Sequence, residues 1–208
     1  MQETSFDDEI RVAIVGAGGY GRLALDVLLE SGVEGEILGF YDDAHAALSS
    51  KVRGFPVLGD IQMLKSMLSV EPVHVIVAIT DNQARLRVAN SIRGIGGRFV
   101  KAVHPLAYLS GAATLGDGTV LAAGAVVHPD AEIGSHCCVG SNAVIERDAV
   151  VGAGVWISAG AVVGSGARIG ARSTMEHHAS VGRKATVEAD TTVSAARFVE
   201  GGRSGGGV

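Results

Sequence analysis

A six-residue repeat of apolar positions runs through the second half of this chain. From Val103 to Val199, every sixth residue is aliphatic or Met, without a change of register. From Ala107 onward, the residue two positions before each of these is small along most of the repeat, with exceptions at Val155 and Arg197. A fixed period of this kind is typical of a solenoid, and a period of six predicts a parallel β-helix over residues 103–199.

Stacking explains how so short a unit can fold. A strand and a corner of six residues bury too little by themselves, whereas stacked units share one continuous interior. We expect three such steps in each coil. Glycine often follows the inward aliphatic residue, as at Gly116 and Gly134, where we expect a tight bend to favour a residue without Cβ.

The first half of the chain alternates apolar runs with helical spacing. Ile10–Val15 has the length and continuous apolar character of a buried parallel strand, and the next segment has helical spacing up to Gly32. The pattern predicts a Rossmann-like βαβ domain over residues 10–102, and so an α/β domain followed by an all-β one. Its later elements are expected at Glu36–Tyr41 (strand), His74–Ile79 (strand), 83–92 (helix) and Arg98–Val103 (strand).

A glycine motif lies between the first strand and its helix. Residues 16–21 read GAGGYG, which satisfies G-x-G-x-x-G, and two acidic residues follow the second strand about twenty residues later. Such glycines let backbone N–H groups approach a pyrophosphate at a helix N-terminus, and the acid binds a ribose or base. The alternative is an α/β domain whose glycines serve only the turn. The predicted nucleotide-binding residues are Gly16, Gly18, Gly19, Gly21, Asp42 and Asp43.

Composition narrows the class of protein. The net charge of -5 argues against a broad nucleic-acid surface. No apolar run reaches the ~18 residues needed to cross a membrane, and the polar, acidic first ten residues are unlike a secretory signal. Cys137 and Cys138 are adjacent and so rarely pair, which favours a reduced, cytoplasmic protein. We expect a leader at residues 1–9 and a disordered Gly-rich tail at 200–208.

Several segments together resemble one known family. They are VAIVGAGGYGRLALDVLLESG, GFYDD, FPVLGD, VAITDNQARLRVA and VHPLAYLSGAATLGDGTVLAAGAVVHPDAEIG, and the likeness covers about Arg11 to Ile169. They are similar to the sialic acid O-acetyltransferase and UDP-4-amino-sugar N-acetyltransferase family. The resemblance implies a left-handed β-helix, a homotrimer, acetyl-CoA as co-substrate and a nucleotide-linked sugar as acceptor. It also implies that the glycines and aspartates named above contact a UDP-type group.

The chain departs from the family where a histidine is expected to act as base. The family motif is roughly aliphatic-x-His-Asp/Glu, with a second His nine residues after the first. In this chain the two positions hold Arg147, which is followed by Asp148, and Trp156. Arginine stays protonated and tryptophan has no basic nitrogen, so neither can accept a proton.

Two substitutes for the missing base are considered. Met175–Gly182 has the same local shape as the motif and contains His177 and His178, but register places it at a different corner of the solenoid from Arg147. His177 is then the candidate base and His178 a residue that orients it. Alternatively, an amine that arrives unprotonated needs only positioning and backbone oxyanion donors.

Three functions therefore remain open. The first is an acetyl-CoA-dependent acyltransferase that modifies an amino or hydroxyl group of a nucleotide-linked sugar with non-standard catalytic residues. The second is a catalytically retired binding or scaffold homologue. The third is a metal hydratase of the carbonic-anhydrase type, which needs three converging His; His177 and His178 are adjacent, no third His lies one coil away, and no metal site is expected. The sequence leaves the sugar, the acylated atom and the acyl chain undetermined.

Overall fold

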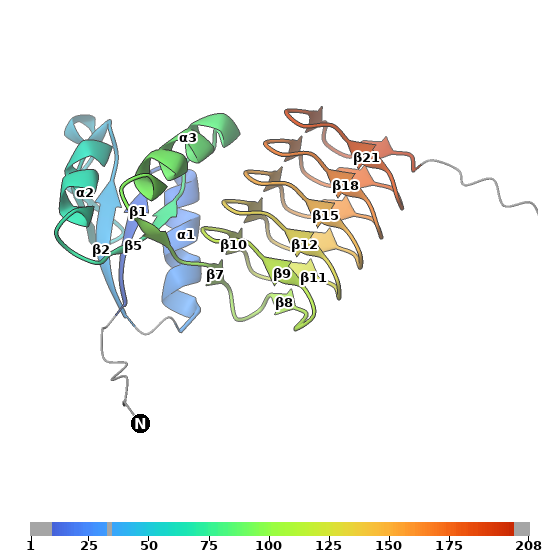
Figure 1. Cartoon of the computed structure of the whole chain (residues 1–208), viewed down its shortest axis with the longest axis horizontal. Helices are drawn as coiled ribbons and strands as arrows, with labels where there is room; N and C mark the ends of the chain where they lie inside the picture. Colours follow the sequence, from blue (N-terminus) through green and yellow to red (C-terminus); the bar gives the residue numbers. More distant parts are fainter. Residues whose placement is uncertain (1–9, 33–34, 202–208) are drawn as a thin grey trace, which may run out of the picture.

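The computed structural model describes residues 10–32 and 35–201, in two domains joined end to end (Figure 1). The predicted leader and most of the predicted tail lie outside these residues. The elements of the N-terminal domain are β1 (Ile10–Val15), α1 (Gly19–Glu30), β2 (Gly35–Tyr41), a 3-10 turn (His45–Ala47), β3 (Lys51–Val52), β4 (Phe55–Gly59), α2 (Ile61–Leu68), β5 (His74–Val77), α3 (Asn82–Arg93) and β6 (Arg98–Phe99).

The N-terminal domain is a six-stranded sheet in the order β3-β4-β2-β1-β5-β6. All its pairings are parallel except that of β3 with β4. The chain moves outward from β1 in both directions, which creates a switch point between β1 and β5 at their carboxyl ends. Helix α1 packs on one face of the sheet, and α2 and α3 pack on the other. The predicted Rossmann-like architecture is confirmed.

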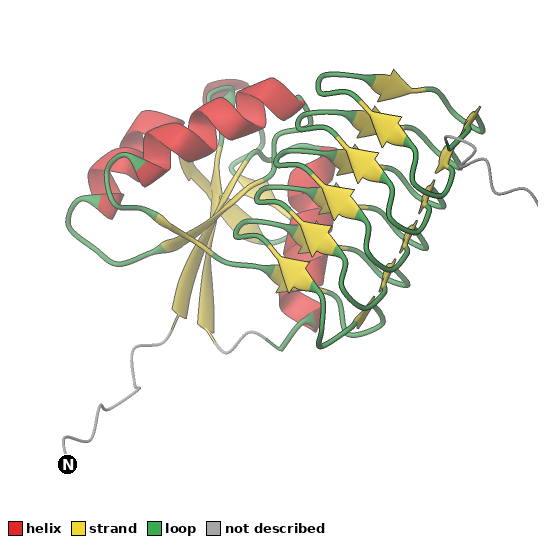
Figure 2. Cartoon of the chain, turned by 45° about the vertical axis from the view of Figure 1, so that its right-hand side comes forward, coloured by secondary structure: helices red, strands yellow, loops and turns green. Residues whose placement is uncertain are grey.

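The second domain is a parallel β-helix built from three sheets, seen as stacked arrows in Figure 2. The first sheet contains β7 (Ala102–Val103), β10 (Val120–Leu121), β13 (Cys138–Val139), β16 (Trp156–Ile157), β19 (Thr174–Met175) and β22 (Thr192–Val193). The second contains β8 (Tyr108–Leu109), β11 (Val126–Val127), β14 (Val144–Ile145), β17 (Val162–Val163), β20 (Ser180–Val181) and β23 (Phe198–Val199). The third contains β9 (Thr114–Leu115), β12 (Glu132–Ile133), β15 (Val150–Val151), β18 (Arg168–Ile169) and β21 (Thr186–Val187).

The β-helix interior follows the predicted ladder. The aliphatic residues of the six-residue repeat and the small residues two positions before them form one continuous core. Val155, the aliphatic exception in the small positions, is fully buried there. Each strand pairs with the strand eighteen residues later, as at Val144 and Val162, so three steps make one coil. The predicted period and its inward face are confirmed.

The glycines that follow the inward aliphatic residues serve a different purpose from the one expected. The bend lies two residues later, where Gly118 and also the non-glycines Asp148 and His178 have positive φ. By contrast, a Cβ at Gly116 would lie 2.3 Å from the backbone nitrogen of Ser135 on the next coil. These glycines therefore permit close stacking of coils rather than a tight bend.

The expected strand Arg98–Val103 is two strands, because the chain changes hydrogen-bond partners within it. Val100 still donates its N–H to Val75 of the N-terminal sheet (3.3 Å), whereas Ala102 donates to Thr119 of the β-helix (3.0 Å). The hairpin of β3 and β4 was not expected from the sequence either.

Candidate functional site

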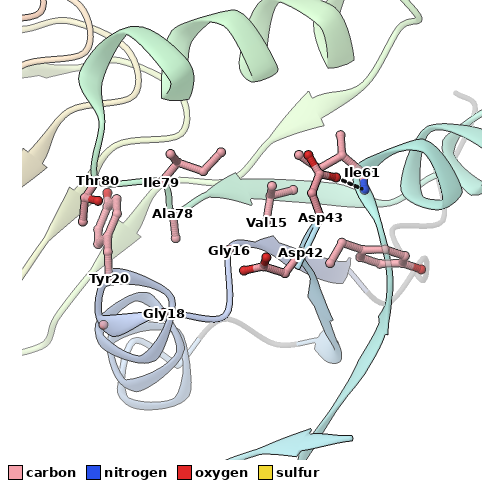
Figure 3. A pocket seen from close by; sticks show the side chains of 12 residues that line it. Val15, Gly16, Gly18, Tyr20, Asp42, Asp43, Ile61, Ala78, Ile79 and Thr80 are labelled. Carbon is pink, nitrogen blue, oxygen red and sulfur yellow. Dashed lines mark hydrogen bonds between the residues drawn. The ribbon is translucent and has the colours of Figure 1, made fainter. Parts of the chain in front are cut away.

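A cavity of about 330 Å3 lies at the carboxyl ends of β1, β2 and β5, beside the switch point. Figure 3 shows the side chains around it, most of which come from the end of β1, the start of α1 and the residues directly after β2 and β5. Its lining residues are Val15, Gly16, Gly18, Gly19, Tyr20, Tyr41, Asp42, Asp43, Ile61, Ala78, Ile79 and Thr80. Five of the six predicted nucleotide-binding residues therefore line one pocket, and Gly21 lies just outside it.

The glycines of the loop divide into two pairs. Gly16 has φ of +99°, and a Cβ there would lie 2.6 Å from the carbonyl oxygen of Ala78. A Cβ at Gly21 would lie 1.9 Å from the carbonyl oxygen of Gly16. These two glycines hold the turn against β5 and α1. A Cβ at Gly18 would meet nothing within 4 Å, so Gly18 and its exposed neighbour Gly19 leave space above the helix start.

Helix α1 begins at this space without a side-chain cap. The other two helices are capped, because Asp60 accepts from the Met63 N–H (2.7 Å) and Asp81 from the Ala84 N–H (2.6 Å). The first N–H groups of a helix lack intrahelical partners and carry a partial positive charge. The start of α1 can therefore receive an anion such as a phosphate.

The two aspartates after β2 have different surroundings. Asp42 accepts from the Ala17 N–H through Oδ2 and from the Ala44 N–H through Oδ1, each at 2.9 Å. It thus braces the glycine loop. Asp43 accepts through Oδ1 from the Ile61 N–H (3.1 Å), and its Oδ2 has no hydrogen bond within the described residues. Asp43 is the carboxylate with an oxygen left for a ligand.

Tyr20 joins this pocket to the β-helix. Its ring is buried and lies edge-on to the indole of Trp156, with centroids 4.9 Å apart. Burial raises the pKa of the Tyr20 phenol, whose hydroxyl has no hydrogen-bond partner among the described residues. The Trp156 Nε1–H donates to Ser158 Oγ (3.2 Å). The position expected to hold the second histidine is thus an interdomain contact.

Arg85 on α3 is a fully buried cation beside the same contact. Within the N-terminal domain it donates to the carbonyl oxygens of Ile79 (2.7 Å) and Thr80 (3.2 Å) and to Asn82 Oδ1 (2.6 Å). Across the boundary it donates to the carbonyl oxygens of His136 (2.9 Å) and Gly154 (2.8 Å). No carboxylate in the described ranges pairs with it. Apolar periodicity gives no signal for a buried arginine, and the sequence analysis missed it.

Helix α3 lies along one corner of the β-helix. We call the equivalent residues His136, Gly154, Arg172 and Asp190, which are eighteen apart, the corner row. Besides the contacts of Arg85, the Asn82 amide donates to the carbonyl oxygen of Arg172 (2.8 Å), and Gln83 donates to Asp190 Oδ1 (3.4 Å). Four successive coils therefore contact one helix, and the N-terminal domain with its pocket is fixed to the solenoid.

Arg147 and Asp148 lie at another corner, between β14 and β15. Both side chains are about two-thirds exposed, and Arg147 Nε lies 3.8 Å from Asp148 Oδ2. The neighbouring Glu146 carboxylate accepts from the N–H (2.8 Å) and the hydroxyl (2.7 Å) of Ser165 on the next coil. The Ser165 hydroxyl, more than any charge, lowers the pKa of Glu146. Glu146 is thus held as a hydrogen-bond acceptor by the next coil.

His177 and His178 are exposed at the corner between β19 and β20. This corner joins the first sheet to the second, whereas Arg147 lies where the second meets the third. The structure therefore does not bring the two histidines together with Arg147 within one chain. A Cβ on Gly160 would lie 2.5 Å from His178 Nδ1, so the His178 ring lies over the coil below. A catalytic role for His177 and His178 stays a prediction.

Among residues 10–32 and 35–201, no group of three His, Cys, Asp or Glu side chains is arranged to hold a metal ion. No helix in these ranges has the length and apolar character needed to span a membrane.

Three family models match the chain. Residues 11–92 match the PglD N-terminal domain, residues 103–147 the bacterial transferase hexapeptide (six repeats), and residues 160–195 the hexapeptide repeat of succinyl-transferase. The chain joins a PglD N-terminal domain to transferase hexapeptide repeats. The acyltransferase resemblance expected from the sequence is confirmed. No curated protein sequence gives a significant match.

Solved structures resemble this two-domain chain over nearly its whole length. A His-to-Asn mutant of perosamine N-acetyltransferase from Caulobacter crescentus, in complex with CoA and GDP-perosamine, is 29% identical with a TM-score of 0.84, covering 91% of this chain and 88% of that one. The acetyltransferase domain of PglB from Neisseria gonorrhoeae, in complex with acetyl coenzyme A, is 28% identical with a TM-score of 0.69, covering 90% and 92%. These likenesses confirm the predicted fold class, including the left-handed β-helix of hexapeptide transferases.

Proposed function

We propose that this protein transfers an acetyl group from acetyl-CoA to an amino group of a nucleotide-linked sugar. One observation supports this most strongly. The N-terminal pocket and the β-helix are fixed to each other as in sugar N-acetyltransferases that cover about nine-tenths of the chain. The pocket has an uncapped helix start for a phosphate and an aspartate oxygen for a ribose or base.

The reaction needs one bond formed and one broken. The lone pair of the sugar amine attacks the thioester carbonyl carbon, which forms a C–N bond and a tetrahedral oxyanion. Collapse of the oxyanion breaks the C–S bond, and the proton lost by nitrogen ends on the sulfur of CoA. Positioning of the amine next to the thioester accounts for most of the acceleration when no base participates.

The residues at the family's histidine positions suit this base-free mechanism. The Arg147 guanidinium stays protonated, and it favours the neutral over the cationic form of a nearby amine. The rate should therefore follow the fraction of sugar amine that is unprotonated. If His177 were the base instead, its removal would lower the rate.

Release of CoA thiol tests the proposal. The purified protein is mixed with acetyl-CoA and a panel of UDP- and GDP-linked amino sugars, and the pH is varied. We expect turnover with at least one amino sugar, none with the matching hydroxyl sugar, and one rise in kcat/KM with pH. His177→Ala should leave the rate unchanged. Absence of both turnover and acetyl-CoA binding by calorimetry would contradict the proposal.

A retired homologue is the second candidate, because both expected histidines are missing. Arg147→His tests it cleanly, since Arg147 is exposed and its one ion pair within residues 10–32 and 35–201 is with Asp148. Activity that appears in Arg147→His and is absent from the parent would support the hypothesis that the parent has lost its catalytic activity. Trp156→His is less informative, because it also removes the contact with Tyr20.

We further propose a homotrimer. The outward residues of the second β-helix sheet form a column that is apolar except at Ser180 and that a second copy would cover. Val126, Val144 and Val162 lie in its middle, and the exposed rings of Tyr108 and Phe198 lie at its ends. Light scattering should give three times the chain mass, and Val144→Arg should give a monomer. We place the protein in the cytoplasm, where the buried free thiols Cys137 and Cys138 would stay reduced.

A further inference from the structure

A groove between α2 and α3 continues from the nucleotide pocket. The two cavities share Asp43 and Ile61, so a ligand can extend from one into the other. The groove is lined by Asp43, Ile61, Gln62, Lys65, Arg87, Val88 and Ser91.

The groove combines an apolar floor with polar edges. Ile61 and Val88 are half-buried and form apolar surface on the two facing helices. Lys65 and Arg87 supply two cations, and neither belongs to an ion pair within the part of the chain that the structure describes. The uncommitted Oδ2 of Asp43 lies at the end nearest the nucleotide pocket. A flat, partly apolar ligand with both donors and acceptors on its edge would fit these groups.

The orientation of a nucleotide follows from the pocket. The diphosphate belongs at the uncapped start of α1, and in this class of fold the acid after the second strand lies beside the ribose. The base then extends beyond Asp43, on the side away from the glycine loop. In this protein that is the groove between α2 and α3. This step rests on the proposed use of a nucleotide-linked substrate.

We infer that the groove binds the nucleobase and selects bases with a carbonyl oxygen next to a ring N–H. Guanine presents O6 and N1–H, and uracil presents O4 and N3–H. The cations Lys65 and Arg87 would donate to the carbonyl oxygen, and Asp43 would accept from the ring N–H. Adenine and cytosine present an amino group and an unprotonated ring nitrogen instead. Their donors would then face the cations, and their lone pair would face the carboxylate.

A second phosphate group is the other ligand that two cations could attract. Binding of a phosphate is disfavoured by the Asp43 carboxylate, which lies in the same groove and would repel an anion. The apolar surface of Ile61 and Val88 also gives a phosphate nothing to bind. These observations favour the base.

Calorimetry with size-matched nucleotide pairs tests the inference. We expect GDP to bind at least tenfold more tightly than ADP, and UDP at least tenfold more tightly than CDP. In the double variant Lys65→Met and Arg87→Met both ratios should fall toward one, while inorganic pyrophosphate should bind as it does to the parent. Arg98→Met, at the opposite edge of the sheet, is the matched control and should leave both ratios unchanged.

Two results would overturn the inference. One is equal affinity within each pair in the parent protein. The other is a loss of pyrophosphate binding in the double variant as large as its loss of GDP or UDP binding, which would assign the cations to a phosphate. The readout needs no acetyl transfer, so selectivity without turnover would contradict only the proposed function, and turnover without selectivity only the base assignment.

Discussion

The indole of Trp156 lies edge-on to the phenol ring of Tyr20, 4.9 Å away and nearly perpendicular to it. One ring belongs to β16 of the β-helix and the other to the first turn of α1, where it lines the nucleotide pocket. Arg85 lies within 6.0 Å of both rings. The position at which the family's second histidine is expected therefore connects the solenoid to the nucleotide site.

Trp156→Ala should affect stability and nucleotide binding together. Loss of a large aromatic side chain from this contact should lower the free energy of unfolding by ~3 kcal/mol. It should also weaken GDP or UDP binding several-fold, because Tyr20 loses the surface that holds it in the pocket. Urea denaturation and calorimetry measure the two effects. Trp156→Phe keeps an aromatic ring and should recover most of both, and a stable Trp156→Ala with normal binding would contradict the role.

Substitutions in the glycine loop should separate folding from binding. Gly16→Ala forces a Cβ against the backbone of Ala78 at positive φ, so it should cost ~2 kcal/mol or more of stability. Gly18→Ala has room in the free protein, and its stability should stay within ~0.5 kcal/mol of the parent. Nevertheless, its methyl group occupies the space for a phosphate, so the Kd of a nucleoside diphosphate should rise about tenfold. Unchanged binding by Gly18→Ala would place the phosphate elsewhere.

Arg85→Ala should destabilise the junction between the domains. It leaves the carbonyl oxygens of His136 and Gly154 buried without their donors, and the expected cost is ~3–5 kcal/mol. Arg85→Lys should not rescue it, because three donors on one atom cannot reach acceptors in both domains. Thermal unfolding compares these variants with Arg87→Ala on the same helix. Arg87 is exposed, so that control should change stability by less than ~0.5 kcal/mol.

His136 should make the stability of the protein depend on pH. Burial, with Arg93 and Arg85 as smaller causes and Asp117 opposing, lowers its pKa from 6.5 to about 4. The unfolded chain binds a proton below pH 6.5 that the folded protein does not, so stability falls as the pH decreases from 6.5 to 4 and then levels off. The loss is ~3 kcal/mol.

The variant His136→Gln isolates this effect from the titration of carboxylates. We expect the stability difference between parent and variant to be constant above pH 6.5 and to shift in favour of the variant down to pH 4. Urea titrations at several pH values measure it. If the free energies of unfolding of the two proteins change in parallel with pH across this range, His136 does not cause the pH dependence of stability.

The β-helix could be predicted because its rule is periodic and local. The inward aliphatic residues recur without a slip, and the structure buries them as one core. The gathering of the glycine loop and the acids after β2 around one pocket could also be predicted, because both have fixed places around a switch point; nucleotide binding there stays a prediction. The division of roles between Asp42 and Asp43 could not, since it depends on which backbone N–H groups each carboxylate meets.

The contacts between the two domains could not be predicted from sequence patterns. Trp156 could be recognised as a departure from a histidine, but its contact with Tyr20 depends on how α1 docks. His136 occupies a corner position of the β-helix, and it is buried because α3 and Phe99 cover it. Each of these contacts joins residues far apart in the sequence, one in the N-terminal domain or at its end and one in the β-helix.

The corner row has a consequence for how the two domains keep their alignment. Successive turns of α3 rise ~5.4 Å, and successive coils of a parallel β-helix are ~4.8 Å apart, so the two repeats are nearly commensurate. Sliding α3 by one coil would let Asn82 and Arg85 meet carbonyl oxygens equivalent to their present ones. Hydrogen bonds alone therefore do not determine which coils of the β-helix α3 contacts. The short connection from β6 to β7 and the single large ring of Trp156 in its sheet specify which coil faces the pocket. A natural gain or loss of whole coils beyond Asp190 would leave the nucleotide at the same height along the solenoid.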